Sequence, residues 1–195
     1  MKRVVACTGG IGSGKSAIVK AFETLGVPAY DCDGGVKRLY REDEGLKASV
    51  AALLGSEVLN GGNLDFKAMS SRLFGNRKLL LQLEELVYPV LGEDIRRWAG
   101  RQKGNLVIVE SAIFLEKAFF ANFADFVITV SAPEEVRVAR VMARDGASRE
   151  DVLKRMSNQW TDAMREEHSD YVIRTDDRHP VLPQIIELIE KLENQ

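Results

Sequence analysis

One short stretch of the chain carries residues whose types and spacing suit the binding of phosphate. Residues 9–16 fit the pattern G-x-x-x-x-G-K-[ST], in which glycines precede a Lys-Ser pair. Glycines lack Cβ atoms, so successive backbone N–H groups can point at phosphate oxygens, and a following helix N-terminus adds unpaired donors. Lys15 would reach the β- and γ-phosphates, and the Ser16 hydroxyl would ligate Mg²⁺. The stretch predicts a nucleoside-triphosphate site formed by Gly9, Gly10, Ile11, Gly12, Ser13, Gly14, Lys15, Ser16 and Ala17.

The residues on either side of this loop predict the elements that position it. Residues 3–7 are apolar and partly β-branched, which is typical of a buried strand. Residues 17–25 carry apolar side chains at the spacing of a helix that packs on a sheet. The alternative is a flexible glycine turn that happens to precede Lys-Ser, but a phosphate-binding loop requires this strand and this helix. We therefore interpret residues 9–16 as a phosphate-binding loop.

Two carboxylates, Asp31 and Asp33, follow a second short strand predicted at residues 29–30. Open α/β sheets bind ligands at the carboxyl ends of their strands, so these side chains fall where a ligand is expected. Either carboxylate could hold Mg²⁺ through water or accept a proton from a hydroxyl nucleophile. Either could instead cap the following helix, and the sequence leaves both roles open for both residues. Gly34 and Gly35 would let a substrate approach the backbone closely.

A third candidate carboxylate, Glu110, follows the strand predicted at residues 106–109. At the end of a central strand in a phosphate-loop fold, an acidic residue orients the metal ion. Glu110 could therefore orient metal-bound water, or it could pair with a basic residue nearby. The sequence favours neither role over the other.

Three arginines share one face of a helix that begins after Pro-Glu-Glu at residues 133–135. Arg137, Arg140 and Arg144 stand at positions i, i+3 and i+7 of that helix. Cations aligned in this way are costly unless they are solvated or face an anion. They therefore form either a solvated face or part of a lid whose guanidinium groups clamp the phosphoryl group in transfer.

The remaining pattern places these residues in an α/β fold. Further strands are predicted at residues 125–130 and 171–173, and alternation with helices predicts a parallel five-stranded sheet with helices on both faces. We expect the three-layer fold of P-loop NTPases, with a helical substrate-binding insertion and a lid. The expected organisation is a single domain over residues 1–195, with a core at 1–33, 104–135 and 170–195, a helical acceptor region at 34–103 and a lid at 136–169.

The helical acceptor region contains two points of interest. Pro89 falls inside residues 76–101, whose apolar side chains repeat at helical spacing, so a kink or a break is expected there. Residues 60–63, Asn-Gly-Gly-Asn, predict a turn. The block as a whole carries no strong strand signal.

Length, charge and cysteine content limit the classes of protein that fit. A net charge of −2 over 195 residues gives no field for a polyanion, so no nucleic-acid partner is expected. No segment has the length of a membrane span, and residues 1–3 lead directly into the first strand, which leaves no room for a signal peptide. Cys7 and Cys32 lie in or beside apolar stretches, which suits a reducing compartment. We expect a cytoplasmic protein without a membrane partner, as a monomer or a small homo-oligomer.

Several motifs, in the same order along nearly the whole chain, resemble the dephospho-CoA kinase family. They are Thr8–Ser16 in the form TGGIGSGKS, residues 25–28, 30–33, 61–65, 140–145 and 170–173, and Arg155 with Gln159. The resemblance implies ATP and Mg²⁺ as cofactors and dephospho-CoA as the substrate. The reaction it implies moves the γ-phosphoryl group of ATP to the ribose 3′-hydroxyl, the last step of coenzyme A biosynthesis.

The same resemblance implies roles for single residues. Asp33 matches the carboxylate that acts as base toward the ribose hydroxyl, which leaves Asp31 as a neighbour that aids the metal or the packing. Lys15 and Ser16 match the contacts to phosphate and Mg²⁺. The implied residues are Asp33, Lys15 and Arg140 for catalysis, Ser16 and Asp33 for the metal, directly or through water, and, in addition to the loop, Arg144 for ATP.

Three positions depart from the family pattern. Tyr88-Pro89 stands in place of His-Pro in the substrate helix, residues 110–114 in place of Val-Pro-Leu-Leu-Phe, and Thr175 in place of Asn after the last strand. These departures concern the acceptor pocket and the adenine contact, and they leave the phosphate contacts intact. The alternatives are another small-molecule or nucleoside monophosphate kinase of this fold, and a non-catalytic nucleotide-binding module. A guanine-selecting module would carry Asn-Lys-x-Asp, which the sequence lacks.

Overall fold

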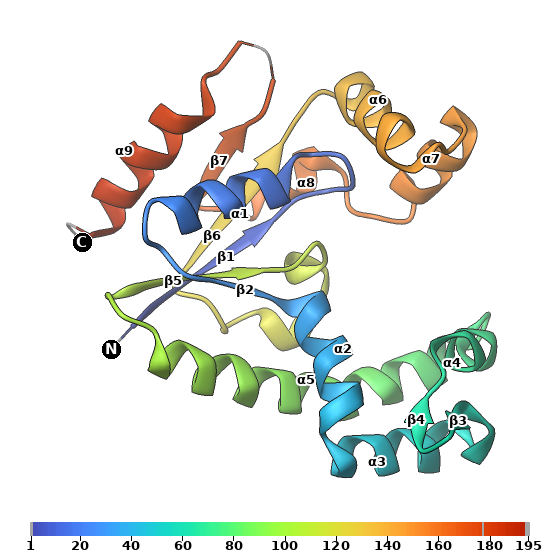
Figure 1. Ribbon diagram of the computed structural model, residues 1–195. Coiled ribbons are helices and arrows are strands. Elements are labelled where there is room, and N and C mark those ends of the chain that lie inside the picture. Colours follow the sequence, from blue (N-terminus) through green and yellow to red (C-terminus); the bar gives the residue numbers. More distant parts are fainter. Residues whose placement is uncertain (1, 177, 194–195) are drawn as a thin grey trace. The chain divides into compact units, whose positions relative to one another are not determined.

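The computed structural model describes residues 2–176 and 178–193 (Figure 1). The chain divides into two compact units. The first unit contains the residues up to Tyr30 and from Gln102 onward, and the second contains residues 31–101. The first carries the larger sheet and the phosphate-binding loop, whereas the second is mainly helical.

The first unit is built on a five-stranded sheet with the strand order β2-β5-β1-β6-β7. Its strands are β1 (Arg3–Thr8), β2 (Ala29–Asp31), β5 (Leu106–Glu110), β6 (Phe126–Ser131) and β7 (Tyr171–Arg174). β1 pairs in parallel with both β5 and β6, and β6 pairs in parallel with β7. The five-stranded parallel sheet predicted from the sequence is confirmed. Parallel strands bring their carboxyl ends to one edge, where open α/β sheets bind ligands.

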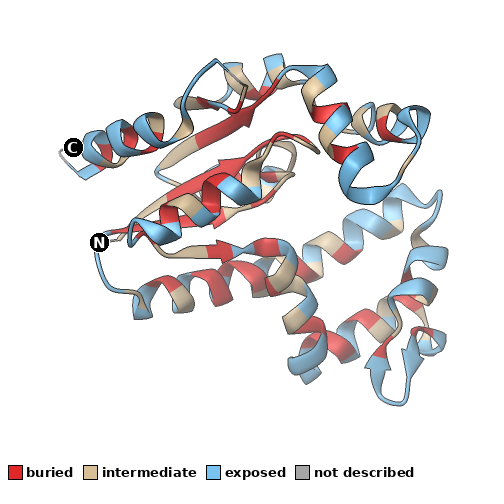
Figure 2. Ribbon diagram, turned by 45° about the horizontal axis from the view of Figure 1, so that its top comes forward, coloured by how far each residue is buried: buried red, intermediate tan, exposed pale blue. Residues whose placement is uncertain are grey.

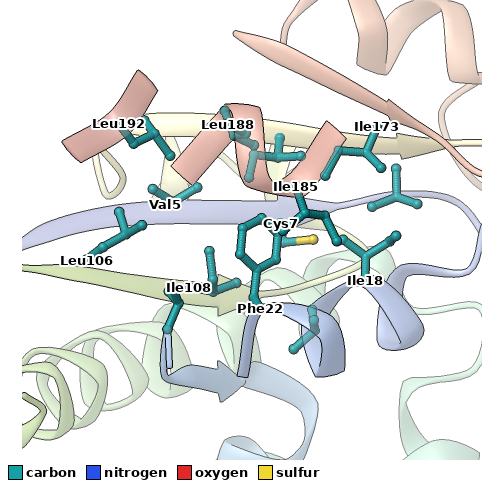
Figure 3. Close-up of a cluster of buried hydrophobic side chains, with 14 residues drawn as sticks. Val5, Cys7, Ile18, Phe22, Leu106, Ile108, Ile173, Ile185, Leu188 and Leu192 are labelled. Atoms are coloured by element: carbon teal, nitrogen blue, oxygen red, sulfur yellow. The ribbon is translucent and has the colours of Figure 1, made fainter. Parts of the chain in front are cut away.

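Apolar runs explain why these segments form the interior of the unit. Residues 107–109 of β5 are fully buried, as expected for a central parallel strand covered on both faces (Figure 2). The amphipathic helices α1 (Lys15–Thr24) and α9 (Val181–Glu193) cover one face of the sheet and add Phe22 and Leu188 to its core (Figure 3). The phosphate-binding loop between β1 and α1 is therefore fixed at both ends by packed elements.

The two cysteines pack as small apolar side chains. Cys7 on β1 is completely buried, and this burial raises the pKa of its thiol to about 12. Cys32 is also buried, and neither cysteine forms a disulfide in the part of the chain that the structure describes. A thiol with so high a pKa stays protonated and unreactive near neutral pH.

Short helices fill the connections of the first unit. The 3₁₀ helices η2 (Phe114–Glu116) and η3 (Ala118–Phe120) follow β5, and α6 (Glu134–Asp145), α7 (Arg149–Met156) and α8 (Asp162–Glu167) follow β6. Val138, Val141 and Val152 form a small apolar cluster that joins α6 to α7. Ser148 caps α7, because its hydroxyl accepts a hydrogen bond from the Asp151 amide at 3.1 Å. These three helices span most of the residues predicted as a lid.

The second unit contains four α-helices and a small hairpin in its described residues. Its elements are α2 (Cys32–Glu42), α3 (Glu44–Leu54), η1 (Ser56–Val58), β3 (Leu59–Asn60), β4 (Asn63–Leu64), α4 (Phe66–Leu73) and α5 (Arg77–Arg101). Val50 and Leu54 of α3 and Leu91 and Ile95 of α5 are almost completely buried. Helix packing on these side chains therefore holds the unit together.

Helix α5 runs without a break through Pro89, so the predicted break does not occur. A proline removes one backbone N–H donor and crowds the carbonyl one turn earlier. Val87 and Leu91 on either side of Pro89 are buried, and packing of this kind offsets the lost hydrogen bond.

The turn predicted at residues 60–63 is confirmed, and it closes a hairpin that the sequence did not predict. β3 and β4 pair antiparallel, with Leu59 opposite Leu64 and Asn60 opposite Asn63. Gly61 and Gly62 adopt φ angles of 57° and 81°, which the tightest hairpin turns require at both central positions. Two-residue strands are too short to show the alternation by which strands are recognised.

Candidate active site

The loop between β1 and α1 has the backbone form of a phosphate cradle. Gly12 and Gly14 take φ angles of 80° and 91°, in the left-handed region that favours glycine. Gly14 is the N-cap of α1, and among the described residues no side chain caps this helix N-terminus and no acidic side chain lies in its first turn. The helix N-terminus therefore offers its donors and its positive dipole end to an anion. Ser16, which the sequence assigned to Mg²⁺, is exposed in this first turn.

The loop glycines also make room for the protein itself. A Cβ atom at Gly10 would collide with the guanidinium group of Arg137, and one at Gly12 would lie 2.5 Å from the Arg137 carbonyl oxygen. A Cβ atom at Gly9 would lie 2.6 Å from the Val130 carbonyl oxygen. The outer side of the loop is thus packed tightly on α6 and β6, which fixes its shape before a ligand binds.

Lys15 forms an ion pair with Glu110 at the carboxyl end of β5. Both side chains are mostly shielded from solvent, with 13% and 15% of their surface exposed. Of the two roles that the sequence left open for Glu110, the structure contains the pairing with a basic residue. An orienting role toward metal-bound water remains a prediction.

The three arginines of α6 have three different environments, which their shared helix face did not reveal. Arg137 is buried, and its Nε donates to the Ile11 carbonyl oxygen at 2.9 Å while its Nη1 donates to Asp162 at 2.7 Å. The Ile11 amide donates to Gln159 Oε1 at 2.9 Å. Arg137 therefore lies on no solvated face, and together with Gln159 it holds both backbone groups of one loop residue.

Arg140 contacts the phosphate-binding loop at Ser13. Its Nη1 donates to Thr175 Oγ1 at 2.9 Å and to the Ser13 carbonyl oxygen at 3.4 Å, and its Nη2 donates to the Thr175 carbonyl oxygen at 2.7 Å. Sequence reasoning placed Arg140 at the lid but did not foresee Thr175 as its partner. This arrangement brings one predicted catalytic cation to the phosphate-binding loop.

Arg144 is the exposed one of the three arginines. Its Nε donates to Asp145 at 2.7 Å, and Arg155 donates to the same carboxylate at 3.0 Å. The hydrogen bond to Asp145 raises the pKa of Arg144, and that from Arg144 lowers the pKa of Asp145. Within the described residues, Arg144 does not hydrogen-bond the phosphate-binding loop.

Behind Arg137 lies a buried charge cluster that the sequence did not predict. Arg165 on α8 is fully buried, donates to Glu116 at 2.7 Å and lies 3.5 Å from Asp162, which also binds Arg137. Burial lowers the pKa of Arg165, and Glu116 is the main opposing influence. Paired charges of this kind are costly to break, because removal of one partner leaves the other buried and uncompensated.

A cavity of about 670 Å³ adjoins this cluster in the first unit. Its lining includes Pro133, Arg137, Trp160, Asp162 and Asp176. Arg137 therefore forms part of the cavity wall with the same side chain that holds the phosphate-binding loop. A ligand in this cavity would contact the support of the loop rather than its phosphate-binding inner side.

In the second unit, the structure separates the roles of Asp31 and Asp33. Asp31 is the N-cap of α2, where its Oδ1 accepts a hydrogen bond from the Asp33 amide at 3.0 Å. A Cβ atom at Gly34 would lie 2.6 Å from Asp31 Oδ2, so this glycine makes room for the cap. Asp33 lies exposed in the first turn of α2, and its carboxylate takes no part in the cap.

Tyr88, a departure from the family pattern, is half-buried on α5. Burial raises the pKa of its hydroxyl group, and Glu84, Tyr40 and Asp33 raise it further. Asp33 and Tyr88 are therefore close enough to interact electrostatically within the second unit. A neutral phenol here can donate a hydrogen bond throughout the physiological pH range.

The described residues offer few ligands to a metal ion. Among the described residues, no group of three or more His, Cys, Asp or Glu side chains could hold a metal ion. A divalent cation at the loop would therefore take few protein ligands. Mg²⁺ is bound in this way in kinases, through one or two side chains together with phosphates and water. The exposed Ser16 hydroxyl beside the cradle fits such a site.

A parallel sheet of this strand order, a phosphate-binding loop and an arginine of α6 at that loop together are typical of a P-loop kinase that acts on a small molecule. Residues 3–180 match the dephospho-CoA kinase family, and the chain belongs to this family. It is an ATP-dependent kinase, and the resemblance carried by the sequence motifs is confirmed. In the described part of the chain, no helix has the length and apolar character needed to cross a membrane.

A curated relative agrees with this assignment, and two solved structures share the fold. A dephospho-CoA kinase from Bacteroides fragilis is 35% identical over 186 residues, which cover 95% of this chain and 90% of the relative. The structure of TT1252 from Thermus thermophilus matches with a TM-score of 0.86 and 28% identity, over 98% of this chain and 97% of that one. Dephospho-CoA kinase from Campylobacter jejuni shares the fold, with a TM-score of 0.61 and 20% identity over 98% and 97% of the two chains.

Proposed function

We propose that this protein transfers the γ-phosphoryl group of ATP to the 3′-hydroxyl group of the dephospho-CoA ribose, which yields coenzyme A and ADP. The observation that carries the proposal is the family match over residues 3–180, which includes both the phosphate-binding loop and Asp33. In the reaction, a bond forms between the ribose 3′-oxygen and the γ-phosphorus. The bond from that phosphorus to the oxygen bridging it to ADP breaks.

The phosphate-binding loop is the donor site in this proposal. The first-turn amides of α1 bind the phosphates, and the Lys15 ammonium exchanges Glu110 for phosphate oxygens when ATP is present. Ser16 would supply its hydroxyl oxygen to a bound Mg²⁺, and Asp33 would act on the ion through water. When bound, Mg²⁺ neutralises charge on the β- and γ-phosphates. Arg140 stabilises the charge on the transferred group from its position at the loop.

Asp33 is the acceptor-side base in this proposal. Its carboxylate accepts the proton of the ribose 3′-hydroxyl group as that oxygen attacks. The exposure of Asp33 and the assignment of the cap to Asp31 support this role, because the Asp33 carboxylate is open to a substrate. Arg144 contributes a further contact to ATP when it exchanges Asp145 for a phosphate.

An acceptor panel tests the proposed reaction. ATP consumption is measured with dephospho-CoA and, separately, with AMP, CMP and shikimate. We expect turnover with dephospho-CoA and background rates with the others. Turnover confined to one of the other three acceptors would overturn the proposal in favour of another small-molecule kinase. ATP binding without turnover on any acceptor would support a non-catalytic module.

We infer the remaining biological context from the chemistry of the chain. A net charge of −2 supports the absence of a nucleic-acid partner. Buried cysteines without a disulfide in the described residues support a cytoplasmic location. We propose a monomer or a small homo-oligomer, without a membrane partner, and light scattering of the purified protein at several concentrations tests the oligomeric state.

A further inference from the structure

Thr175 joins three segments that are far apart in the sequence. It follows β7 directly, and its amide donates to the Ser131 carbonyl oxygen at 2.9 Å, which continues the pairing of β7 with β6. Only 6% of its surface is exposed. The backbone of Thr175 is therefore fixed by the sheet, and its side chain points into the protein.

The hydroxyl group of Thr175 acts both as a donor and as an acceptor. Oγ1 donates to the Ser13 carbonyl oxygen at 2.5 Å and accepts from Arg140 Nη1 at 2.9 Å. The Thr175 carbonyl oxygen accepts from Arg140 Nη2 at 2.7 Å. Two hydrogen bonds to two nitrogens fix the plane of the guanidinium group, which a single bond would leave free to rotate.

The position of this contact relates it to phosphate binding. A Cβ atom at Gly14 would lie 3.4 Å from Thr175 Oγ1 and 3.5 Å from Arg140 Nη1. Gly14 is the N-cap of α1, where the donors of the phosphate cradle begin. Thr175 therefore packs with Arg140 directly on the residue that caps α1 within the phosphate-binding loop.

The contacts of Arg140 show what would be lost without the hydroxyl group. Within the described residues, the direct hydrogen bond of Arg140 to the loop is the 3.4 Å contact with the Ser13 carbonyl oxygen, which is long for a hydrogen bond. An arginine side chain has many rotamers, and ordering it costs conformational entropy. The two hydrogen bonds to Thr175 offset that cost in the folded protein, before any ligand binds.

We propose that Thr175 is a positioning residue that holds the Arg140 guanidinium group and the Ser13 carbonyl in the geometry used for phosphoryl transfer. This proposal rests on the proposed function of Arg140. Thr175 acts through Arg140 and through the loop backbone, and its own side chain does not contact the transferred group. Preset donors of this kind need no reorganisation during the reaction, which is why they lower its barrier.

Two Thr175 variants separate the hydroxyl group from the shape of the side chain. Thr175→Val keeps the shape and removes both functions of the hydroxyl, whereas Thr175→Ser keeps the hydroxyl. We expect Thr175→Val to lower kcat by about tenfold to a hundredfold, as displacement of a catalytic group does. The KM for ATP should change by less than about threefold, and Thr175→Ser should retain kcat within about threefold of wild type. An unchanged kcat in Thr175→Val, or an equal loss in Thr175→Ser, would overturn the proposal.

A double-mutant cycle with Arg140→Ala tests whether Thr175 acts through the arginine. We expect Arg140→Ala to lower kcat by about a hundredfold, and Thr175→Val to cause little further loss in that background. Losses that multiply would overturn the proposal, since they would show that the two residues act independently. Thermal unfolding confirms that each variant is folded at the assay temperature. The cycle measures the effect of Thr175→Val both in wild type and in the Arg140→Ala background, so any loss of stability that it causes is present in both measurements.

The cycle also separates this proposal from the proposed function. If wild type does not phosphorylate dephospho-CoA, the proposed function fails. If wild type is active and Arg140→Ala is as active as wild type, the role of Arg140 fails and the positioning role falls with it. If Arg140→Ala is impaired but Thr175→Val is not, only the positioning role fails.

Discussion

The two units hold their predicted functional residues in different ways. In the first unit, residues far away in the sequence hold the phosphate-binding loop. Arg137 and Gln159 hydrogen-bond the backbone of Ile11, and Thr175 hydrogen-bonds that of Ser13. The Lys15 side chain forms an ion pair with Glu110. In the second unit, Asp33 lies exposed in the first helical turn, and only its backbone amide takes part in the helix cap. The donor side is thus preorganised by the protein, whereas the acceptor side keeps its carboxylate open.

This difference has a physical reason. Phosphate is bound by backbone amides, so the backbone must already have the right shape, and buried partners supply that shape at no cost during catalysis. A general base must instead reach a substrate hydroxyl group and exchange a proton with it. We therefore expect substitutions in the first unit to damage the site through its supports as well as through its phosphate contacts, and substitutions in the second to damage it through the reacting group alone.

The largest effect should come from Lys15→Met. The substitution removes the cation that would bind the transferred phosphates, and it leaves Glu110 without its ion-pair partner in a mostly shielded place. We expect turnover with dephospho-CoA to fall about a thousandfold or more. Lys20→Met, on the exposed side of the same helix, is the matched control and should retain activity. If the turnover of Lys15→Met stayed within about tenfold of that of wild type, the ion pair of Lys15 with Glu110 would have a structural role only.

The next effect separates the two aspartates of the second unit. Asp33→Asn removes the proposed base and should lower kcat by about a hundredfold to ten-thousandfold, with ATP binding retained. Asp31→Asn removes a carboxylate from the same helix terminus but preserves the cap, because Asn caps helices as well as Asp does. Its kcat should stay within about threefold of wild type. Equal losses in both variants would contradict the assignment of the base to Asp33.

A pair of glycine substitutions compares the packing of the two units. Gly10→Ala adds a Cβ atom where the Arg137 guanidinium group lies, so it should destabilise the protein by about 1–3 kcal/mol. At Gly100, near the end of α5, a Cβ atom would meet nothing within 4 Å among the described residues outside its own stretch of helix, and Gly100→Ala should be neutral or stabilise by about 0.5–1 kcal/mol. Urea unfolding measures both. A Gly10→Ala protein as stable as wild type would show that the loop is not packed on α6.

The effect that is smallest at neutral pH concerns the Cys7 thiol, and it grows only above pH 9.0. Burial raises the pKa of Cys7 in the folded protein to about 12 from an ordinary value of 9.0, so loss of its proton favours the unfolded state. The contribution is fully present below pH 9.0 and is lost as the pH rises toward 12. Between these limits, the free energy of unfolding should fall by up to about 1.4 kcal/mol per pH unit more steeply in wild type than in Cys7→Ala. Parallel pH curves for the two proteins would contradict the burial of this thiol.

Local patterns predicted the strand, the loop and the helix of the phosphate-binding segment. The loop, its strand and its helix are neighbours in the sequence, so one motif predicted the cradle of Gly12, Gly14, Lys15 and Ser16. The five strands were found because buried parallel strands are continuous apolar runs. The hairpin β3–β4 was not predicted, because its strands are too short to show alternation. At Pro89 a kink or a break was predicted, and the break is absent because buried neighbours of the proline hold the helix together.

Contacts between distant segments lay beyond the sequence patterns. Helical spacing placed Arg137, Arg140 and Arg144 on one face, but it could not say which would be buried, which would meet the loop and which would stay exposed. Those differences depend on Asp162, Thr175 and Asp145, which no periodicity connects with the arginines. The choice between Asp31 and Asp33 as helix cap likewise depended on the residue at which α2 begins, because Asp31 precedes the helix and Asp33 lies in its first turn.

The most direct test of the central claim is the identity of the phosphorylated product. Purified protein is incubated with ATP, Mg²⁺ and dephospho-CoA, and the product is examined by ³¹P nuclear magnetic resonance and mass spectrometry. Coenzyme A, which already carries the 3′-phosphate, serves as the blocked acceptor in a parallel reaction. The proposed function predicts one new phosphomonoester at the ribose 3′ position and no reaction with the blocked acceptor. Consumption of ATP with dephospho-CoA recovered unchanged, or phosphorylation at another position, would contradict it.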